Sequence, residues 1–69
     1  MNLNNLKVLR ESKDISYQTM AEQLDVSLQY YWMIENGKRG LSYEMAIKIA
    51  SVLGTTPDKI FLTKYLTIG

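Results

Sequence analysis

The side chains that could do chemistry in this 69-residue chain are hydroxyls, amides and charged groups, because the sequence contains no histidine and no cysteine. Without those two residue types, the usual zinc sites and the Ser–His and Cys–His nucleophile pairs cannot be built. The carboxylates are scattered, and no glycine-rich phosphate loop is present. We therefore predict no enzyme activity, no catalytic residue, no metal, no cofactor and no small-molecule ligand. Function must rest on hydrogen bonding, apolar contact and charge.

Charge is unevenly distributed along the chain, although the net charge is only +1. Residues 1–13 carry +2, residues 14–35 carry −4 without any basic residue, residues 36–48 carry +2 and residues 49–69 carry +1. The densest positive point is the adjacent pair Lys38-Arg39. A polyanionic partner would therefore find few cations, mainly in the two basic flanks of an acidic centre.

The length and apolar content fit one small globular domain over residues 1–69. A chain this short buries only about 60% of its unfolded surface, so one modest core is expected. The longest uninterrupted apolar run is the five residues Tyr30–Ile34, against roughly 18 needed to span a bilayer. The first residues lack the basic start and apolar stretch of a signal peptide. We therefore expect a cytoplasmic protein without a membrane segment.

Helices must position the functional side chains, because apolar residues recur at helical spacing and alternating apolar and polar runs are scarce. Ser16, Ser27 and Ser42 each precede such a stretch and are good N-caps. Gly37 and Gly54 are suited to close the helices that they follow. We predict a compact all-α fold of five helices, over residues 4–13, 17–24, 28–36, 43–53 and 57–61.

Only three residues, Asp25-Val26-Ser27, separate the second predicted helix from the third. So short a connection forces a large crossing angle, as in a helix-turn-helix, whose second helix enters the major groove of DNA. Ala21 is small where the helices would cross, and Asp25 tolerates a left-handed backbone better than most residues. We therefore predict a helix-turn-helix over about residues 17–36. The side chains expected to face inward are Leu24, Val26, Tyr31 and Ile34.

The residues from about Leu6 to Phe61 resemble the lambda-repressor-like domain of the phage repressor and Cro class, the XRE family of transcription regulators. The likeness is to the small single-domain form common in Gram-positive bacteria and their mobile elements. It implies a sequence-specific DNA-binding regulator that acts as a homodimer and places the helix over 28–36 in the major groove of a two-fold operator. The segments that carry the resemblance are Met20-Ala21-Glu22, Val26-Ser27, Ile34–Arg39 and Lys48–Gly54.

The resemblance also implies a structural ion pair between Arg10 and Glu35. In this family an arginine late in the first helix pairs with the glutamate that ends the recognition helix. If the pair is buried, removal of one partner leaves an unpaired charge at a cost of about 3–5 kcal/mol. The alternative for Arg10 is a solvated charge on a helix.

The resemblance places five residues against the bases of the groove: Ser27, Leu28, Gln29, Trp32 and Met33. Gln29 is the best base reader, because its amide can bond adenine N6 and N7 together. A solvated side chain is the alternative for Gln29. Leu28 and Met33 can contact thymine methyl groups, or they can pack internally or against another protein. Trp32 can donate its indole N–H to a phosphate, or its ring can lie in an interface with a partner.

The same resemblance places the phosphate contacts on both sides of that helix, at Tyr17, Gln18, Tyr30, Asn36, Lys38, Arg39, Ser42 and Tyr43. Tyr17 stands where the family usually has glutamine, so its hydroxyl or the Gln18 amide would have to replace that contact. Tyr30 can instead cover the edge of the helix, and Lys38 and Arg39 can be ordinary solvated loop residues. Ser42 and Tyr43 open a helix whose N–H groups and dipole can hold a phosphate.

A protein-interaction module is the alternative function, because the third helix has an apolar face that could grip another protein. The homodimer contact is expected around the fifth helix and the tail over residues 62–69. Fraying of that tail is the alternative, with the fifth helix only closing the core. The apolar residues of the tail are Leu62, Tyr65, Leu66 and Ile68.

Overall fold

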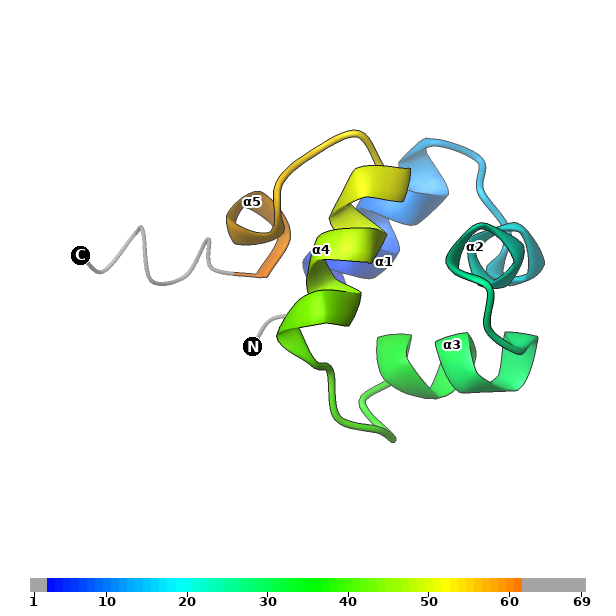
Figure 1. Ribbon diagram of the computed structural model, residues 1–69. Helices are drawn as coiled ribbons and strands as arrows, with labels where there is room; N and C mark the ends of the chain where they lie inside the picture. Colours follow the sequence, from blue (N-terminus) through cyan, green and yellow to red (C-terminus); the bar gives the residue numbers. More distant parts are fainter. Residues whose placement is uncertain (1–2, 62–69) are drawn as a thin grey trace.

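The computed structural model describes residues 3–61, and in this range the chain forms five helices and no strand (Figure 1). The helices are α1 (Leu3–Ser12), α2 (Tyr17–Leu24), α3 (Leu28–Glu35), α4 (Tyr43–Val52) and α5 (Pro57–Phe61). The prediction of an all-α, five-helix fold is confirmed, and each predicted helix end lies within one residue of the observed end. The predicted dimer contact of the tail over residues 62–69 lies outside the described residues.

Serine hydroxyls start the three central helices. The Oγ atoms of Ser16, Ser27 and Ser42 each accept a hydrogen bond from the backbone N–H three residues further on, at 3.1, 3.0 and 3.1 Å. Each serine has an extended backbone, as an N-cap requires. The starts of α2, α3 and α4 are therefore set by local sequence.

The ends of α1 to α4 share one arrangement, in which a residue with a left-handed backbone follows the helix. These residues are Asp14, Asp25, Gly37 and Gly54, with φ angles of 57°, 59°, 73° and 70°. The N–H of each donates to the carbonyl three residues earlier, and the next N–H donates to the carbonyl five residues earlier. This Schellman motif satisfies carbonyls that a helix end would otherwise leave unpaired. Aspartate can stand in for glycine here because it tolerates positive φ better than most residues.

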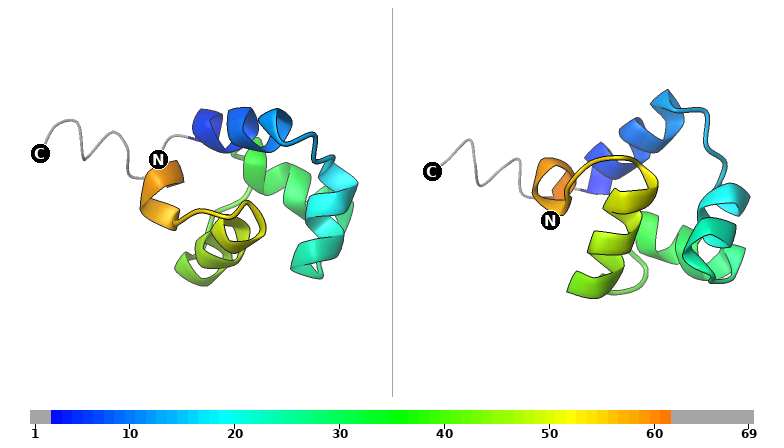
Figure 2. Two further views of the ribbon diagram at one scale, coloured as in Figure 1. Left: turned by 90° about the horizontal axis from the view of Figure 1, so that it is seen from above. Right: turned by 45° about the horizontal axis from the view of Figure 1, so that its top comes forward.

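The core lies between the five helices, and every helix contributes buried side chains to it. α2 packs against α3 and α4, α1 packs against α3 and α5, and α4 packs against α5. In both views of Figure 2, α2 and α3 lie at one end of the molecule and α5 lies at the other. No helix within residues 3–61 has the length and apolar composition to cross a membrane. The largest fully buried side chains are Tyr31, Leu6, Met20, Ile34, Ile49, Leu53 and Ile60.

Candidate nucleic-acid interface

α2 and α3 form a helix-turn-helix whose turn is Asp25–Ser27. Asp25 takes the left-handed backbone that allows the chain to reverse in so few residues. In Figure 1, α2 is seen nearly end-on while α3 runs across the view, so the two axes cross steeply. Ala21 on α2 is buried, as are Tyr31 and Ile34 on α3. The packing of these side chains fixes the direction in which the opposite face of α3 points.

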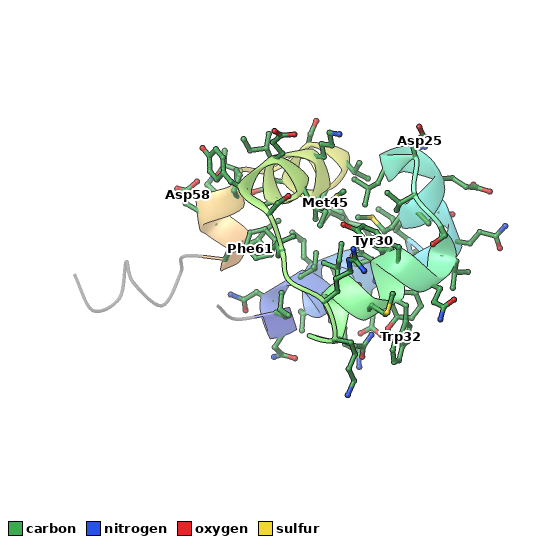
Figure 3. The ribbon with its side chains drawn as sticks, turned by 60° about the horizontal axis from the view of Figure 1, so that its bottom comes forward. Asp25, Tyr30, Trp32, Met45, Asp58 and Phe61 are labelled. Atoms are coloured by element: carbon green, nitrogen blue, oxygen red, sulfur yellow. The ribbon has the colours of Figure 1, made fainter. Side chains whose placement is uncertain are left out.

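The outer face of α3 carries most of the residues for which base contacts are predicted. Leu28 and Trp32 are 47% and 39% exposed, and Gln29 is exposed beside them. Met33 is half-buried, so only part of its side chain is open to a partner. Figure 3 looks onto α3 and shows Trp32 on the side of this helix away from α4. The face combines an amide with apolar area, which suits both adenine edges and thymine methyl groups.

Ser27, the remaining predicted base contact, begins this helix. Its Oγ accepts the hydrogen bond from the Tyr30 N–H, at 3.0 Å. A serine hydroxyl also carries a proton of its own that it can donate. Ser27 is exposed, so it can cap α3 and donate to a base or a phosphate at the same time.

Exposed polar groups follow α3 in the loop and at the start of α4. Lys38 and Arg39 are exposed in the loop, and Ser42 and Tyr43 are exposed where α4 begins. Tyr43 is 76% exposed. The first N–H groups of an α-helix have no partner within the helix, so the start of α4 offers donors to a phosphate. These four exposed residues follow α3 in the chain, and Glu44 adds a carboxylate to the first turn of α4.

The two half-buried tyrosines for which phosphate contacts are predicted carry arginines on their rings. The guanidinium carbon of Arg10 lies 4.2 Å from the centre of the Tyr17 ring, and that of Arg39 lies 4.9 Å from the centre of the Tyr30 ring. Both distances are within the range of a cation–π interaction. The sequence prediction missed both contacts, because they join residues that meet only when the chain folds.

The two amides for which phosphate contacts are predicted also have partners within the chain. Asn36 Nδ2 donates to the Trp32 carbonyl at 2.9 Å, which closes the last turn of α3. Gln18 Nε2 lies 3.5 Å from Glu22 Oε2, a long contact on the surface of α2. An amide nitrogen has two protons, so each amide retains a donor for a partner.

Arg10 and Glu35 form a buried ion pair between α1 and α3. Arg10 Nε and Nη2 donate to the two carboxylate oxygens of Glu35 at 2.8 and 3.0 Å. Arg10 Nη1 donates to the Ile15 carbonyl at 2.6 Å. The Arg10 and Glu35 side chains are only 6% and 1% exposed. The hydrogen bonds to Glu35 raise the pKa of Arg10 above its usual value, so the guanidinium stays charged. The pair ties the far end of α3 to the rest of the fold.

Comparison with known proteins agrees with this geometry. A family model described as helix-turn-helix matches residues 6–60. The chain belongs to the helix-turn-helix family, in its XRE form. It is also 44% identical over 59 residues to the control protein C.MunI of Mycoplasma sp., a match that covers 84% of this chain and 80% of that protein. The resemblance seen in the sequence is confirmed, and these relationships identify a DNA-binding regulatory protein.

In this helix-turn-helix protein, the sequence prediction did not anticipate one buried polar group, the hydroxyl of Tyr31. Tyr31 was expected in the core and is fully buried there. Its hydroxyl lies near enough to the Glu35 carboxylate to interact with it, but no hydrogen bond of normal geometry joins it to any residue in the described range. Burial raises the pKa of Tyr31, and the Glu35 carboxylate acts in the same direction. The apolar run that contains Tyr31 predicts that the ring is buried but does not predict where its hydroxyl lies.

The surface charge of the helix-turn-helix is mixed. Glu22 on α2 and Asp25 in the turn are exposed, whereas Lys38 and Arg39 follow α3. A DNA backbone is therefore attracted on the side of the loop after α3 and repelled at the end of α2.

Proposed function

We propose that this chain is a sequence-specific transcription regulator that binds DNA as a homodimer, with α3 of each copy in the major groove of a two-fold operator. The observation that carries the proposal is the outer face of α3. Leu28, Gln29 and Trp32 are exposed there, while the inner face of the same helix is buried. A helix whose inner face is packed in the core can enter the major groove as a rigid unit and contact the bases with its outer face. The name of the relative, a control protein, supports a regulatory role.

Contacts to the bases come from the outer face of α3 in this proposal. Gln29 binds an adenine edge through its amide. Leu28, Trp32 and the open part of Met33 contact thymine methyl groups, and Ser27 donates its hydroxyl proton at the start of the helix. An operator with A·T pairs in each half-site follows from this composition.

Contacts to the phosphates come from both ends of the helix-turn-helix. Lys38, Arg39 and the start of α4 at Ser42 and Tyr43 bind one strand. Gln18, together with the Tyr17 hydroxyl and the second donor of Asn36, supplements them. These groups fix position and orientation, while the outer face of α3 supplies sequence preference.

Selection of bound sequences from a random DNA pool, at about 0.15 M salt, tests the proposal. We expect enrichment of a two-fold sequence with half-sites separated by about one helical turn. Enrichment of a single half-site would contradict the homodimer and retain the DNA-reading role. Absence of any enriched sequence would contradict sequence-specific binding.

A protein-interaction module is the second candidate function, and the exposed apolar side chains of Leu28 and Trp32 favour it. A protein partner captured through α3 should then remain bound when excess duplex DNA is added. Displacement of the partner by DNA would instead show that the two compete for one face. Variants of Gln29 should affect DNA binding more strongly than binding of a protein to the apolar residues.

A further inference from the structure

The guanidinium of Arg39 rests on the ring of Tyr30, 4.9 Å from the ring centre. We propose that Tyr30 is a positioning residue: it holds the Arg39 guanidinium beside the first half of α3, where Arg39 neutralises a phosphate at the edge of the groove. This inference rests on the proposed DNA-binding function. It gives Tyr30 a role through Arg39, in place of a contact made by the Tyr30 hydroxyl itself.

The backbone after α3 brings these two residues together. Gly37 has φ of +73°, a backbone conformation that is strained for residues with a side chain. The Gly37 N–H donates to the Ile34 carbonyl at 3.2 Å, and the Lys38 N–H donates to the Met33 carbonyl at 2.8 Å. The chain therefore reverses at the end of α3. Arg39 then returns along the helix to the ring of Tyr30, the third residue of α3.

The orientation of the Tyr30 ring is set by packing, whereas an arginine side chain such as that of Arg39 has many rotatable bonds. Tyr30 is half-buried and packs against the core, so the fold sets the orientation of its ring. Arg39 is exposed, and a free arginine side chain has many rotamers to lose when it binds. A guanidinium that already lies on a ring has fewer rotamers to lose, so its binding to a phosphate costs less conformational entropy.

The position of the pair suits a phosphate contact. In Figure 3, Tyr30 lies on the side of α3 that faces α4, and Trp32 lies on the opposite side. The same side leads to the exposed start of α4 at Ser42 and Tyr43. Arg39 on Tyr30 therefore adds a cation to an edge that already offers helix N–H groups. Lys38, next to Arg39, has no ring contact among the described residues and provides a matched comparison.

The test is a double-variant cycle on binding to a short duplex of mixed sequence at low ionic strength, measured by fluorescence anisotropy. Tyr30→Leu, which removes the ring, should weaken binding about two- to five-fold, equivalent to about 0.5–1 kcal/mol. Tyr30→Phe, which removes only the hydroxyl, should leave binding unchanged. Tyr30→Leu should have no further effect in an Arg39→Ala background, whereas its effect should persist fully in a Lys38→Ala background.

Two results of this cycle would overturn the inference. The first is a loss of binding with Tyr30→Phe as large as that with Tyr30→Leu, because the hydroxyl would then be the contact. The second is an undiminished effect of Tyr30→Leu in the Arg39→Ala background, because Tyr30 would then act without Arg39. Thermal unfolding of each variant ensures that binding is compared among folded proteins.

The pairing itself can be measured without DNA, which separates this inference from the proposed function. The side-chain methylene protons of Arg39 should show ring-current shifts in the NMR spectra of the original protein and of Tyr30→Phe. Those shifts should disappear in Tyr30→Leu, and their absence from the original protein would overturn the inference even if DNA binds. Failure of the original protein to bind any DNA would overturn the proposed function and, with it, the role of the pair.

Discussion

The guanidinium of Arg10 connects the first three helices. It extends from α1, pairs with Glu35 on α3 and lies over the ring of Tyr17 at the start of α2. Charges this deeply buried are costly unless every partner is present. The orientation of α3 therefore depends in part on Arg10, a buried side chain that is not itself exposed to a partner.

Removal of either member of this pair should destabilise the protein. We expect Arg10→Met and Glu35→Gln each to lower the free energy of unfolding by about 3–5 kcal/mol, because the remaining group loses its buried partner. The double variant Arg10→Met/Glu35→Leu should recover much of this loss. Urea unfolding followed by circular dichroism measures both effects. Glu11→Gln, at an exposed site of α1, is the control, and a loss as small as the control's in the single variants would contradict a structural role.

Tyr31 should make the protein sensitive to alkaline pH. Its pKa is raised in the folded state, so above about pH 10 the unfolded chain releases this proton while the folded chain retains it. The free energy of unfolding should therefore be unaffected by this group at lower pH and should fall by up to about 1.4 kcal/mol per pH unit as the pH rises further.

Tyr31→Phe is the control for that pH dependence, which it should reduce. At neutral pH the same variant should raise the free energy of unfolding by about 1 kcal/mol, because a buried hydroxyl without a partner is removed. A lower stability of Tyr31→Phe at neutral pH would show that the hydroxyl is hydrogen-bonded to Glu35 in solution.

Gln29→Ala tests the predicted base reader. We expect a loss of about 1–3 kcal/mol in binding free energy on the selected operator and a relaxed preference at one base position. Gln23→Ala changes an exposed glutamine of α2 outside the predicted contacts and is the matched control. Equal losses on every sequence would show that Gln29 contributes to affinity and not to base recognition.

At the scale of the helices, the sequence is highly informative because the signals that start and end a helix are local. Three serine caps and the left-handed residues Asp25, Gly37 and Gly54 explain why the predicted ends lie so close to the observed ends. Asp14 was not predicted to be left-handed, because aspartate favours that conformation far less strongly than glycine does. The contact of Arg39 with Tyr30 escaped prediction because it requires the reversal at Gly37 and the packing of α3.

Substitutions of Ser27 should separate its effect on the stability of α3 from its effect on DNA binding. Ser27→Ala removes the hydrogen bond to the Tyr30 N–H and should lower the free energy of unfolding by about 1 kcal/mol. Ser27→Asp can still accept that bond but adds a negative charge, so it should keep stability and lose DNA affinity. Thermal unfolding and anisotropy measure the two effects. Full DNA affinity of Ser27→Asp would show that Ser27 lies away from the duplex.

At the scale of the whole molecule, the family and the helix-turn-helix follow from short segments in a fixed order, so they were accessible from the sequence. The Arg10–Glu35 pair was suggested only by family resemblance, because residues 25 positions apart give no spacing signal of their own. The operator sequence and the proposed dimer contact depend on how α3 meets DNA and how two copies meet each other, and no local sequence signal encodes either arrangement. The net charge of the chain allows a quantitative prediction of how DNA binding depends on salt.

The low net charge should produce a shallow salt dependence. With two or three phosphates neutralised by cations in each subunit, the logarithm of the association constant should fall with the logarithm of salt concentration at a slope of about −4 to −6 per dimer. Anisotropy titrations on the selected operator over a series of salt concentrations measure the slope. Lys38→Ala should reduce its magnitude by about 1 for each subunit. A slope near −10 would mean that further basic residues contact DNA.

The reversal after α3 has a consequence for how this protein can diverge or be redesigned. The hydrogen bonds that close α3 there come from main-chain groups and from the Asn36 amide, and the positive φ of Gly37 favours glycine. Positions 38 and 39 can therefore change without disturbing the helix that precedes them. Under the proposed function, overall affinity for DNA and choice of sequence are then separately adjustable: affinity at the two loop positions, and sequence choice on the outer face of α3.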